Sequence, residues 1–525
     1  MEIALFDTTL RDGTQMEGLS LSVDDKLKIA RLLDGFGIHY VEGGWPASNP
    51  KDSEFFHRGK TLGLKHAKLT AFGSTRRTKS RAEDDANLRA LVEAETPAVC
   101  IFGKSWLLHV TQVLATTPEE NLAMIADSVA FLKRQGREVV YDAEHFFDGY
   151  RADPAYALST IAAAADAGAD WVTLCDTNGG SLPAWITEVV TRVRGEIPTP
   201  IGIHTHNDGE LAVANSLAAV QAGCSMVQGT INGFGERCGN ANLVAIIPAL
   251  QLKMGHTCVA DDKLQHLTEL SRVVSEVANL RPDPHAAYVG HSAFAHKGGV
   301  HVAAVEKVAA SYEHIPPERV GNRRHVVVSE LAGRGNVRVR ASELGIDTRG
   351  DEKALVARIK ELENAGYQFE AAEGSFELLV RRNDPSYTPP FDILDVVVIS
   401  ERRRGHETFV EATVKLRVDG HVRHEVAEGD GPVHALDRAM RKALGAHFAS
   451  LKQMHLTDYK VRILDPERAA AAKTRVLLEA TYGEQQWTTI GVADNVIEAS
   501  CTALADSIEL HLARERELAQ KGSVA

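Results

Sequence analysis

The segment Leu5–Glu17, LFDTTLRDGTQME, joins a short apolar run to a cluster of ionisable side chains. The run Ile3–Asp7 is predicted to form a β-strand. Soon after it come Arg11, a fixed positive fork for a carboxylate or an enolate, and Asp12, a hard oxygen ligand for a divalent cation. The alternative is a capped strand–helix turn in which Asp12 only satisfies backbone groups. The rest of the chain has to decide between these interpretations.

Length, composition and charge limit the class of protein. A chain of 525 residues is too long for one ordinary domain and predicts two to four units. Its net charge of −13 argues against a general surface for nucleic acid or for an anionic membrane, although small anionic substrates stay possible. Without a long apolar run or a signal peptide, the chain is expected to be cytoplasmic. Its 6 cysteines contain no CxxC motif, which disfavours a disulfide framework and a zinc-thiolate site.

Residues 1–258 alternate short apolar runs with amphipathic helical stretches. Several helices are predicted to begin at a cap residue or a proline, as at Ser22, Thr117-Pro118 and Asp153-Pro154. Eight βα units in about 250 residues predict a (β/α)8 barrel, a TIM barrel of the α/β class. A doubly wound sheet is the alternative, but the first βα turn lacks G-x-G-x-x-G. The predicted strands are Ile3–Asp7, Tyr40–Glu42, Lys68–Phe72, Ala98–Phe102, Glu138–Ala143, Trp171–Asp176, Pro200–Thr205 and Met226–Gly229.

Two further regions are expected after the barrel. Residues 259–372 mix helical segments with stretches rich in glycine, proline and histidine, which indicates helical linker subdomains. Residues 373–525 are expected to form a C-terminal regulatory and dimerisation domain of α+β type. Its predicted strands are Phe376–Val380, Phe391–Ser400, Thr408–Val418 and Arg475–Tyr482, and its predicted helices are Pro432–Phe448 and Asn495–Leu512.

The two tail helices form a weak internal repeat. At an offset of 64 residues, Ala435 matches Ala499 and Ala439 matches Ala503, and a glycine-containing turn precedes each helix. Coincidence between two amphipathic helices is the alternative. Because strands and turns agree as well, the pattern favours a duplicated domain that binds an effector and dimerises.

Polar side chains follow seven of the eight predicted barrel strands, at the end where TIM barrels carry their active sites. His204 and His206 stand at positions i and i+2 of a strand, so both face the same side. Two imidazoles with a carboxylate suit a divalent metal. Asp12 and Asn240 follow strands one and eight, which adjoin in a closed barrel, and are expected to converge on the histidines. Zinc, manganese, cobalt and magnesium all stay open, and a hydrogen-bonded histidine pair is the alternative.

Other polar residues at the strand ends have two interpretations each. Glu144 fits either a base or proton relay, or a residue that orients a metal ligand or an arginine. Thr177 could bind a substrate carboxylate or cap the next helix. Arg76 and Arg77 could meet CoA phosphates, although a solvated loop is favoured.

Long motifs carry a resemblance to a known family. LFDTTLRDGTQ, VEGGWP, LCDTNGG, GIHTHNDGELAVANSLAAVQAG and VQGTINGFGERCGNANL are similar to the acyl-CoA-dependent Claisen-condensing enzymes, the family of 2-isopropylmalate, homocitrate and citramalate synthases. FAHKGGVHVAAV and SYEHIPPERVGN resemble the linker of that family, and the tail resembles its allosteric domain. EGGWPASNPKDSEFF, IFGKSWLLHV, YDAEHFFDGY and FAHKGGVH are most similar to its citramalate synthases, whereas isopropylmalate synthases typically have EAGFP at positions 42–46.

The resemblance implies roles for residues of the barrel. It implies that Arg11 holds the keto-acid oxygen and stabilises the developing enolate and alkoxide. Thr177 matches the threonine that binds the keto-acid carboxylate, and Glu144 matches a glutamate near the substrate. Asp142 stands where relatives vary with substrate. The positions that match metal ligands are Asp12, His204, His206 and Asn240.

The resemblance also implies roles for two linker residues. His301 and Tyr312 match residues with acid–base roles that complete the site of a partner subunit. Relatives often have an acid two residues after the histidine, where this chain has Ala303. A histidine–acid relay is therefore in doubt, and Glu306 or Glu313 is expected to orient His301 instead.

The function implied is the condensation of acetyl-CoA with pyruvate and water to (R)-citramalate and CoA by a metal-dependent homodimer. Isoleucine is the expected effector at the tail, with leucine as the alternative. A 2-isopropylmalate synthase that uses 2-ketoisovalerate is the main alternative function. A lyase of related barrel type and a non-catalytic binding protein are weaker alternatives.

Overall fold

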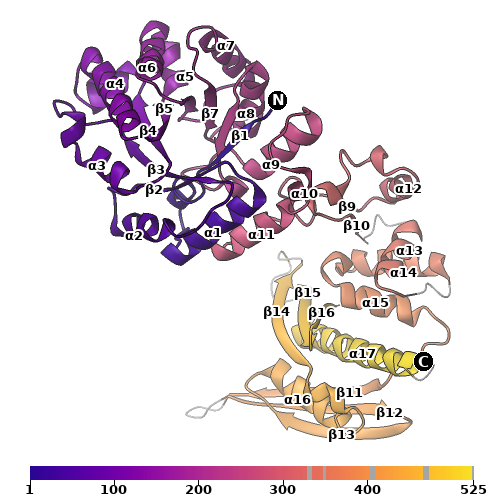
Figure 1. Cartoon of the computed structure of the whole chain (residues 1–525). Coiled ribbons are helices and arrows are strands. Elements are labelled where there is room, and N and C mark those ends of the chain that lie inside the picture. Colours follow the sequence, from indigo (N-terminus) through magenta and orange to yellow (C-terminus); the bar gives the residue numbers. More distant parts are fainter. Residues whose placement is uncertain (328–333, 347–350, 403–407, 465–466, 468–471, 523–525) are drawn as a thin grey trace. The chain divides into compact units, whose positions relative to one another are not determined.

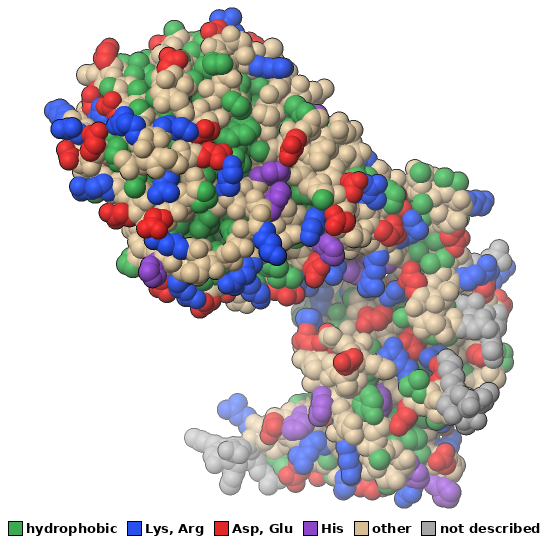
Figure 2. Space-filling view, viewed as in Figure 1, with side chains coloured by type: hydrophobic (Ala, Val, Ile, Leu, Met, Phe, Trp, Pro, Cys, Tyr) green, Lys and Arg blue, Asp and Glu red, His purple; other side chains and the backbone are tan. Residues whose placement is uncertain are grey.

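The computed structural model describes residues 1–327, 334–346, 351–402, 408–464, 467 and 472–522. Contacts divide the chain into two compact units. Unit 1 contains residues 1–294 and 315–323, and unit 2 contains residues 295–314 and the described part of 324–525. No helix in the described part of the chain is long and apolar enough to cross a membrane. On the face drawn in Figure 2, acidic and basic side chains are interspersed.

Unit 1 is built on a closed barrel of parallel strands in the order β1 to β8, surrounded by helices (Figure 1). β1 pairs with both β2 and β8, which closes the barrel and excludes the open doubly wound sheet. The predicted barrel is thus confirmed. The strands are β1 Ala4–Asp7, β2 Tyr40–Gly44, β3 Lys68–Ser74, β4 Ala98–Lys104, β5 Glu138–Glu144, β6 Trp171–Asp176, β7 Ile201–Thr205 and β8 Met226–Gly229.

The helices of unit 1 begin where the sequence predicts a cap. Ser22 and Asp25 form a reciprocal capping box at the start of α1, and the side chains of Thr117 and Asp153 accept backbone hydrogen bonds at the starts of α4 and α6. The helices are α1 Val23–Phe36, α2 Pro50–Gly59, α3 Ala86–Glu93, α4 Pro118–Arg134, α5 Phe146–Ala152, α6 Pro154–Asp166, α7 Pro183–Val193, α8 Ala212–Ala222, α9 Leu243–Pro248, α10 Asp261–Leu264 and α11 Leu267–Val277.

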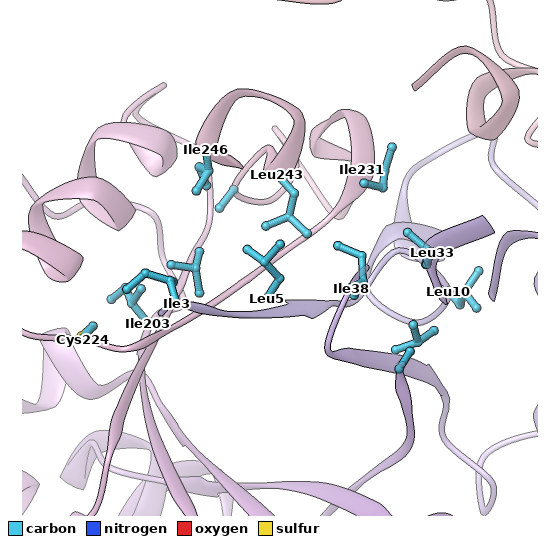
Figure 3. Close-up of a cluster of buried hydrophobic side chains, with 14 of the residues drawn as sticks. Ile3, Leu5, Leu10, Leu33, Ile38, Ile203, Cys224, Ile231, Leu243 and Ile246 are labelled. Carbon is cyan, nitrogen blue, oxygen red and sulfur yellow. The ribbon is translucent and has the colours of Figure 1, made fainter. Parts of the chain in front are cut away.

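Alternation along each strand separates two hydrophobic layers. Leu5 of β1 and Ile203 of β7 belong to the large cluster between strands and helices, which Figure 3 shows together with Leu243 and Ile246 of α9. Phe6 and Val140 belong to a second cluster, which collects side chains from six strands inside the barrel. Because side chains alternate along a strand, His204 points to the interior, opposite to Ile203. The alternation of side chains along the strands therefore directs these polar residues toward the barrel interior, at its mouth.

The linker part of unit 2 is mainly helical, as predicted. One segment expected as a strand, Phe376–Val380, is wrong, because it lies inside α15 (Glu373–Arg382). A five-residue apolar run does not distinguish a strand from a buried helix, and here Phe376 and Val380 share one buried helix face. The other elements are β9 Ala295–His296, α12 Gly299–Lys307, β10 His325–Val326, α13 Arg334–Glu343 and α14 Glu352–Asn364.

The tail contains two successive units of three antiparallel strands followed by a helix, which confirms the predicted duplication. Ala435, Ala439, Met440 and Leu444 of the first helix and their counterparts at an offset of 64 residues all have 0 % exposure. The first unit is β11 Asp392–Glu401, β12 Phe409–Val418, β13 His421–Glu428 and α16 Pro432–Leu444. The second is β14 His455–Ile463, β15 Thr474–Tyr482, β16 Gln485–Ala493 and α17 Val496–Gly522.

Candidate active site and metal centre

The carboxyl ends of the barrel strands surround a cavity of about 250 Å³. Each of the eight strands, or the loop that follows it, contributes a side chain to its wall. This arrangement confirms the prediction that the polar strand ends converge at one mouth. The contributing residues include, in strand order, Asp12, Trp45, Phe72, Phe102, Asp142, Thr177, His204 and Glu236.

Asp12, His204 and His206 form a buried cluster whose ligand atoms lie within 4.8 Å of one another. His204 Nε2 is 3.3 Å from Asp12 Oδ2 and 3.2 Å from His206 Nε2. Burial and the neighbouring His204 lower the pKa of His206 to about 3, so its imidazole is neutral. Burial raises the pKa of Asp12, but Arg11 and both histidines outweigh it and lower the pKa, which keeps a carboxylate. A carboxylate and two imidazoles are a donor set for a divalent cation.

Polar atoms without partners support this interpretation. Asp12 Oδ2 and Asn240 Oδ1 are buried and have no hydrogen-bond partner among the described residues. The backbone of Asn240 forms a β-bridge with His206, while its amide nitrogen lies 3.3 Å from Phe234 O, to which it donates. The backbone bridge places Asn240 beside His206, and its role as a fourth metal donor stays a prediction. Leaving such atoms buried and unpaired costs about 1–3 kcal/mol each, which a bound cation would remove.

Arg11 is held on three sides at the edge of this cluster. Its Nε donates to Glu42 Oε2 at 2.6 Å, and its Nη1 is 3.1 Å from Asp12 Oδ1. Its guanidinium also lies over the ring of Phe72, 3.7 Å from the centroid. Burial raises the pKa of Glu42 to about 7, against the opposing effect of Arg11. Glu42 was missed as a partner of Arg11 because it lies on another strand, β2.

Thr177 and Glu144 lie on the wall of the same cavity. Thr177 does not cap the next helix, since α7 begins at Pro183; its Oγ1 accepts from the backbone N–H of His145 at 2.9 Å. Glu144 is ion-paired with Lys104, which ends the neighbouring strand β4. Lys104 was also missed as the partner of Glu144, because the sequence of β5 does not show which basic residue ends the neighbouring strand β4.

Asp142 is buried beside an unpredicted residue, Gln228 of β8. Gln228 Nε2 donates to Asp142 Oδ1 at 2.8 Å, and Gln228 Oε1 is 2.8 Å from His204 Nδ1. Burial raises the pKa of Asp142, while His204 and the Gln228 hydrogen bond oppose that shift. Gln228 stands in the strand MVQG, and only the alternating period of that strand could have indicated that it faces the interior.

Arg76 and Arg77 have different surroundings. Arg76 is buried and paired with Glu120 at 2.8 Å and with Asp127 at 2.8 Å, so its prediction as part of a solvated loop is wrong. These two acids come from α4, which sequence inspection did not relate to the β3 loop. Arg77 is exposed, as the favoured prediction states.

The two linker residues with implied acid–base roles belong to unit 2. The rings of His301 and Tyr312 are stacked, with centroids 4.2 Å apart, and both side chains are exposed. Glu313 does not orient His301, because its carboxylate is bound by His296 at 3.1 Å and by Arg324 at 2.5 Å. The prediction for Glu313 is therefore wrong, that for Glu306 stays a prediction, and the group observed against the His301 ring is the ring of Tyr312.

Profiles of known protein families match the chain in three consecutive parts. The HMGL-like family matches residues 2–274, and the homocitrate synthase post-HMGL domain-like family matches residues 288–366. The LeuA allosteric (dimerisation) domain matches residues 370–512. The first match covers the whole barrel and the polar residues at its mouth.

Individual proteins are similar along almost the whole chain. An (R)-citramalate synthase of Geobacter sulfurreducens is 52% identical over 520 residues, which cover 98% of this chain and 98% of that protein. An (R)-citramalate synthase of Aquifex aeolicus is 53% identical over 521 residues, with 98% and 99% covered. A 2-isopropylmalate synthase of Methanocaldococcus jannaschii is 31% identical over 520 residues, with 98% and 96% covered.

Proposed function

The chain belongs to the (R)-citramalate synthases of the HMGL-like family, and on this premise we propose that it condenses acetyl-CoA with pyruvate and water to (R)-citramalate and CoA. The observation that carries the proposal is the buried cluster of Asp12, His204 and His206 with Arg11 beside it. A site for a divalent cation next to a fixed guanidinium suits the addition of an enolate to the carbonyl group of a keto acid.

A divalent cation is the expected cofactor, and its residues would be Asp12, His204, His206 and Asn240. When bound, such an ion supplies a Lewis acid for the carbonyl of the keto acid. The mixed oxygen and nitrogen donors are compatible with manganese, zinc, cobalt or magnesium. The donor atoms without hydrogen-bond partners support the presence of an ion rather than its identity.

The chain's own residues can carry the remaining steps. Glu144 takes a proton from the acetyl methyl group of acetyl-CoA, and the resulting enolate carbon forms a bond to C2 of pyruvate. Arg11 donates to the oxygen at C2 as it becomes an alkoxide, and Thr177 donates to the pyruvate carboxylate. Proton transfer to the alkoxide gives the tertiary alcohol. Water then cleaves the thioester, releasing CoA as a thiol, which makes the reaction irreversible.

An aromatic wall supports pyruvate as the acceptor. Trp45 contacts Phe72 and Phe102 edge-on, with centroids 5.7 and 5.8 Å apart, and the two phenylalanine rings stack at 5.5 Å. All three rings line the 250 Å³ cavity. Interlocked rings leave room for a small group such as the pyruvate methyl better than for the isopropyl group of 2-ketoisovalerate.

His301 and Tyr312 are proposed to act as acid–base residues that complete the site of a partner subunit in a homodimer. The match to the LeuA allosteric (dimerisation) domain supports dimerisation. The stacked and exposed arrangement of the two rings supports a role toward another surface.

The tail is proposed to bind isoleucine as an inhibitor. A cavity of about 560 Å³ lies between α16 and β14, where Val433, Leu451 and Met454 adjoin Asp437 and Arg441. The aliphatic part of this lining suits the side chain of an aliphatic amino acid, and the Asp437–Arg441 pair, joined at 2.8 Å, would have to exchange partners to bind its two charges. Leucine is the alternative effector.

A thiol-release assay across a panel of 2-keto acids tests the proposal. We expect pyruvate to give the highest kcat/KM and isoleucine to inhibit more strongly than leucine. Faster release with 2-ketoisovalerate would instead favour 2-isopropylmalate synthase. A Leu456→Arg variant, which fills the tail cavity, should lose inhibition and keep its kcat/KM. Val422→Arg, at an exposed position of the same tail, is the matched control.

A further inference from the structure

We propose that Gln228 is a positioning residue that selects the metal-binding form of His204. This inference rests on the proposed metal centre and concerns a residue outside its four ligands. Gln228 lies on β8 with 0 % exposure, and its amide bridges Asp142 and His204. Gln228 is thus proposed to act only through His204, without contacting the substrate.

The direction of the hydrogen bonds follows from the chemistry of the groups. A carboxylate only accepts, so the Gln228 amide nitrogen faces Asp142, 2.8 Å away. The same nitrogen is 3.2 Å from Thr173 Oγ1, which fixes the amide from a second side. Gln228 Oε1 is thereby turned toward His204 Nδ1 at 2.8 Å and can only accept from it.

The consequence for His204 is a single tautomer. With its proton on Nδ1, the ring presents an unprotonated Nε2, which is the atom near Asp12 and His206. A ring of the other tautomer would point an N–H at the metal position and could not ligate. Partners behind a ligating histidine typically change metal affinity by about 10–100-fold when removed.

Within the described residues, His206 lacks a hydrogen bond like the one that Gln228 forms with His204. Its Nδ1 is buried without a hydrogen-bond partner among the described residues. Only His204 is therefore oriented by a hydrogen bond behind the ring. We expect the centre to depend more on Gln228 than on any comparable group behind His206.

The test measures metal binding by the full chain rather than activity. Apoprotein is titrated calorimetrically with Mn²⁺, and the visible spectrum of its Co²⁺ complex reports the ligand set. Gln228→Leu should raise the Kd for Mn²⁺ by about 10-fold or more and alter the Co²⁺ spectrum. Thr70→Val is the matched control, because it removes a buried hydroxyl on β3, away from β7 and β8, and should bind as the wild type does.

A charge swap keeps the proposal testable if Gln228→Leu does not fold. Gln228→Glu alone places a second carboxylate against Asp142 and should weaken Mn²⁺ binding. Gln228→Glu combined with Asp142→Asn restores one acceptor toward His204 and one donor between the two side chains. This double variant should recover the wild-type Kd to within about threefold.

Two results would contradict different parts of the argument. Wild-type affinity and an unchanged Co²⁺ spectrum in both Gln228→Leu and Gln228→Glu would overturn the role of Gln228 and leave the metal centre intact. A wild-type chain that binds neither ion would overturn the metal centre itself, and the role of Gln228 with it.

Discussion

At the scale of single residues, Arg11 and the Asp12–His204–His206 cluster have separate proposed roles in the site. The guanidinium is fixed by Glu42, Asp12 and the ring of Phe72 before a substrate arrives. Asp12 Oδ2 and Asn240 Oδ1 are buried without a hydrogen-bond partner in the described part of the chain, and the proposed cation would compensate the cost of their burial. In the proposed reaction, charge is therefore placed in advance where the alkoxide would develop.

Arg11→Lys tests the geometry of that arrangement. Lysine keeps the positive charge but loses the planar guanidinium, which donates to Glu42 and stacks on the ring of Phe72. We expect kcat/KM to fall about 10²–10³-fold, the usual effect of removing one oxyanion donor. The Mn²⁺ affinity should stay near the wild-type value, since Arg11 is not a proposed ligand. A kcat/KM within threefold of the wild type would contradict the role assigned to the fork.

Removal of the metal should abolish turnover. We expect chelator-treated protein to release no CoA above background and to regain activity with Mn²⁺ or another divalent ion. Asn240→Leu removes the fourth proposed donor at similar volume and should raise the concentration of Mn²⁺ needed for half-maximal recovery about tenfold or more. Full activity after exhaustive chelation, verified by elemental analysis, would exclude the metal-dependent mechanism.

At the scale of elements, ion pairs join α15 to α17 in unit 2. Arg382 of α15 donates to Asp506 at 2.8 Å and to Glu509 at 2.6 Å on α17. Glu377 of α15 receives Arg514 of α17 at 2.5 Å. Burial raises the pKa of Asp506 to about 6, although Arg382 opposes this shift. The helix that was predicted as a strand is thus joined to the tail through charged contacts, while Phe376 and Val380 pack in the linker core.

The raised pKa of Asp506 predicts a pH dependence of stability. The folded chain holds this proton up to pH about 6, while the unfolded chain releases it near 3.8, so the contribution to stability falls as the pH rises between these values. The contribution amounts to about 3 kcal/mol. Asp506→Asn should remove this part of the slope of unfolding free energy measured from pH 4 to 6. An identical slope in both proteins would contradict the assignment.

Loss of Arg382 should reduce the stability of unit 2 more than loss of Arg338, whose ion pair is more exposed. Arg382→Met leaves two acids of α17 without their cation and should destabilise unit 2 by about 3 kcal/mol, the low end for a buried pair because Arg382 is partly exposed. Arg338→Met breaks an exposed pair with Glu352 and should cost less than about 1 kcal/mol. Equal losses in denaturant unfolding would show that burial does not set the difference.

At the scale of the whole molecule, the proposed chemistry needs residues from both units. Arg11 and the metal cluster belong to unit 1, whereas His301 and Tyr312 belong to unit 2. The family match of the tail supports a dimer. A homodimer in which each linker serves the partner's barrel would unite the two sets of residues.

Subunit mixing tests this arrangement. Arg11→Ala and His301→Ala chains should each be nearly inactive alone. Denatured together at equal amounts and refolded, they should recover about a quarter of the wild-type activity, because half of the dimers then contain one complete site. Each variant refolded by itself is the control. If mixing restores nothing while light scattering shows mixed dimers, the partner subunit does not complete the site.

The sequence alone determined the features that depend on local pattern. Eight βα units predicted the barrel, the i, i+2 spacing placed His204 and His206 on one face, and adjacency of the first and last strands brought Asp12 toward them. The 64-residue offset predicted the duplicated tail. Each of these rests on a period or a spacing that the chain displays without its fold.

Only the tertiary structure decided which residues stand behind the site and how short ambiguous segments fold. Glu42, Lys104 and Gln228 contact Arg11, Glu144 and His204 across pairs of neighbouring barrel strands. Such pairs depend on the register between adjacent strands, which no local spacing encodes. Phe376–Val380 became a helix because packing against the linker core, not intrinsic preference, decides the state of a five-residue apolar run.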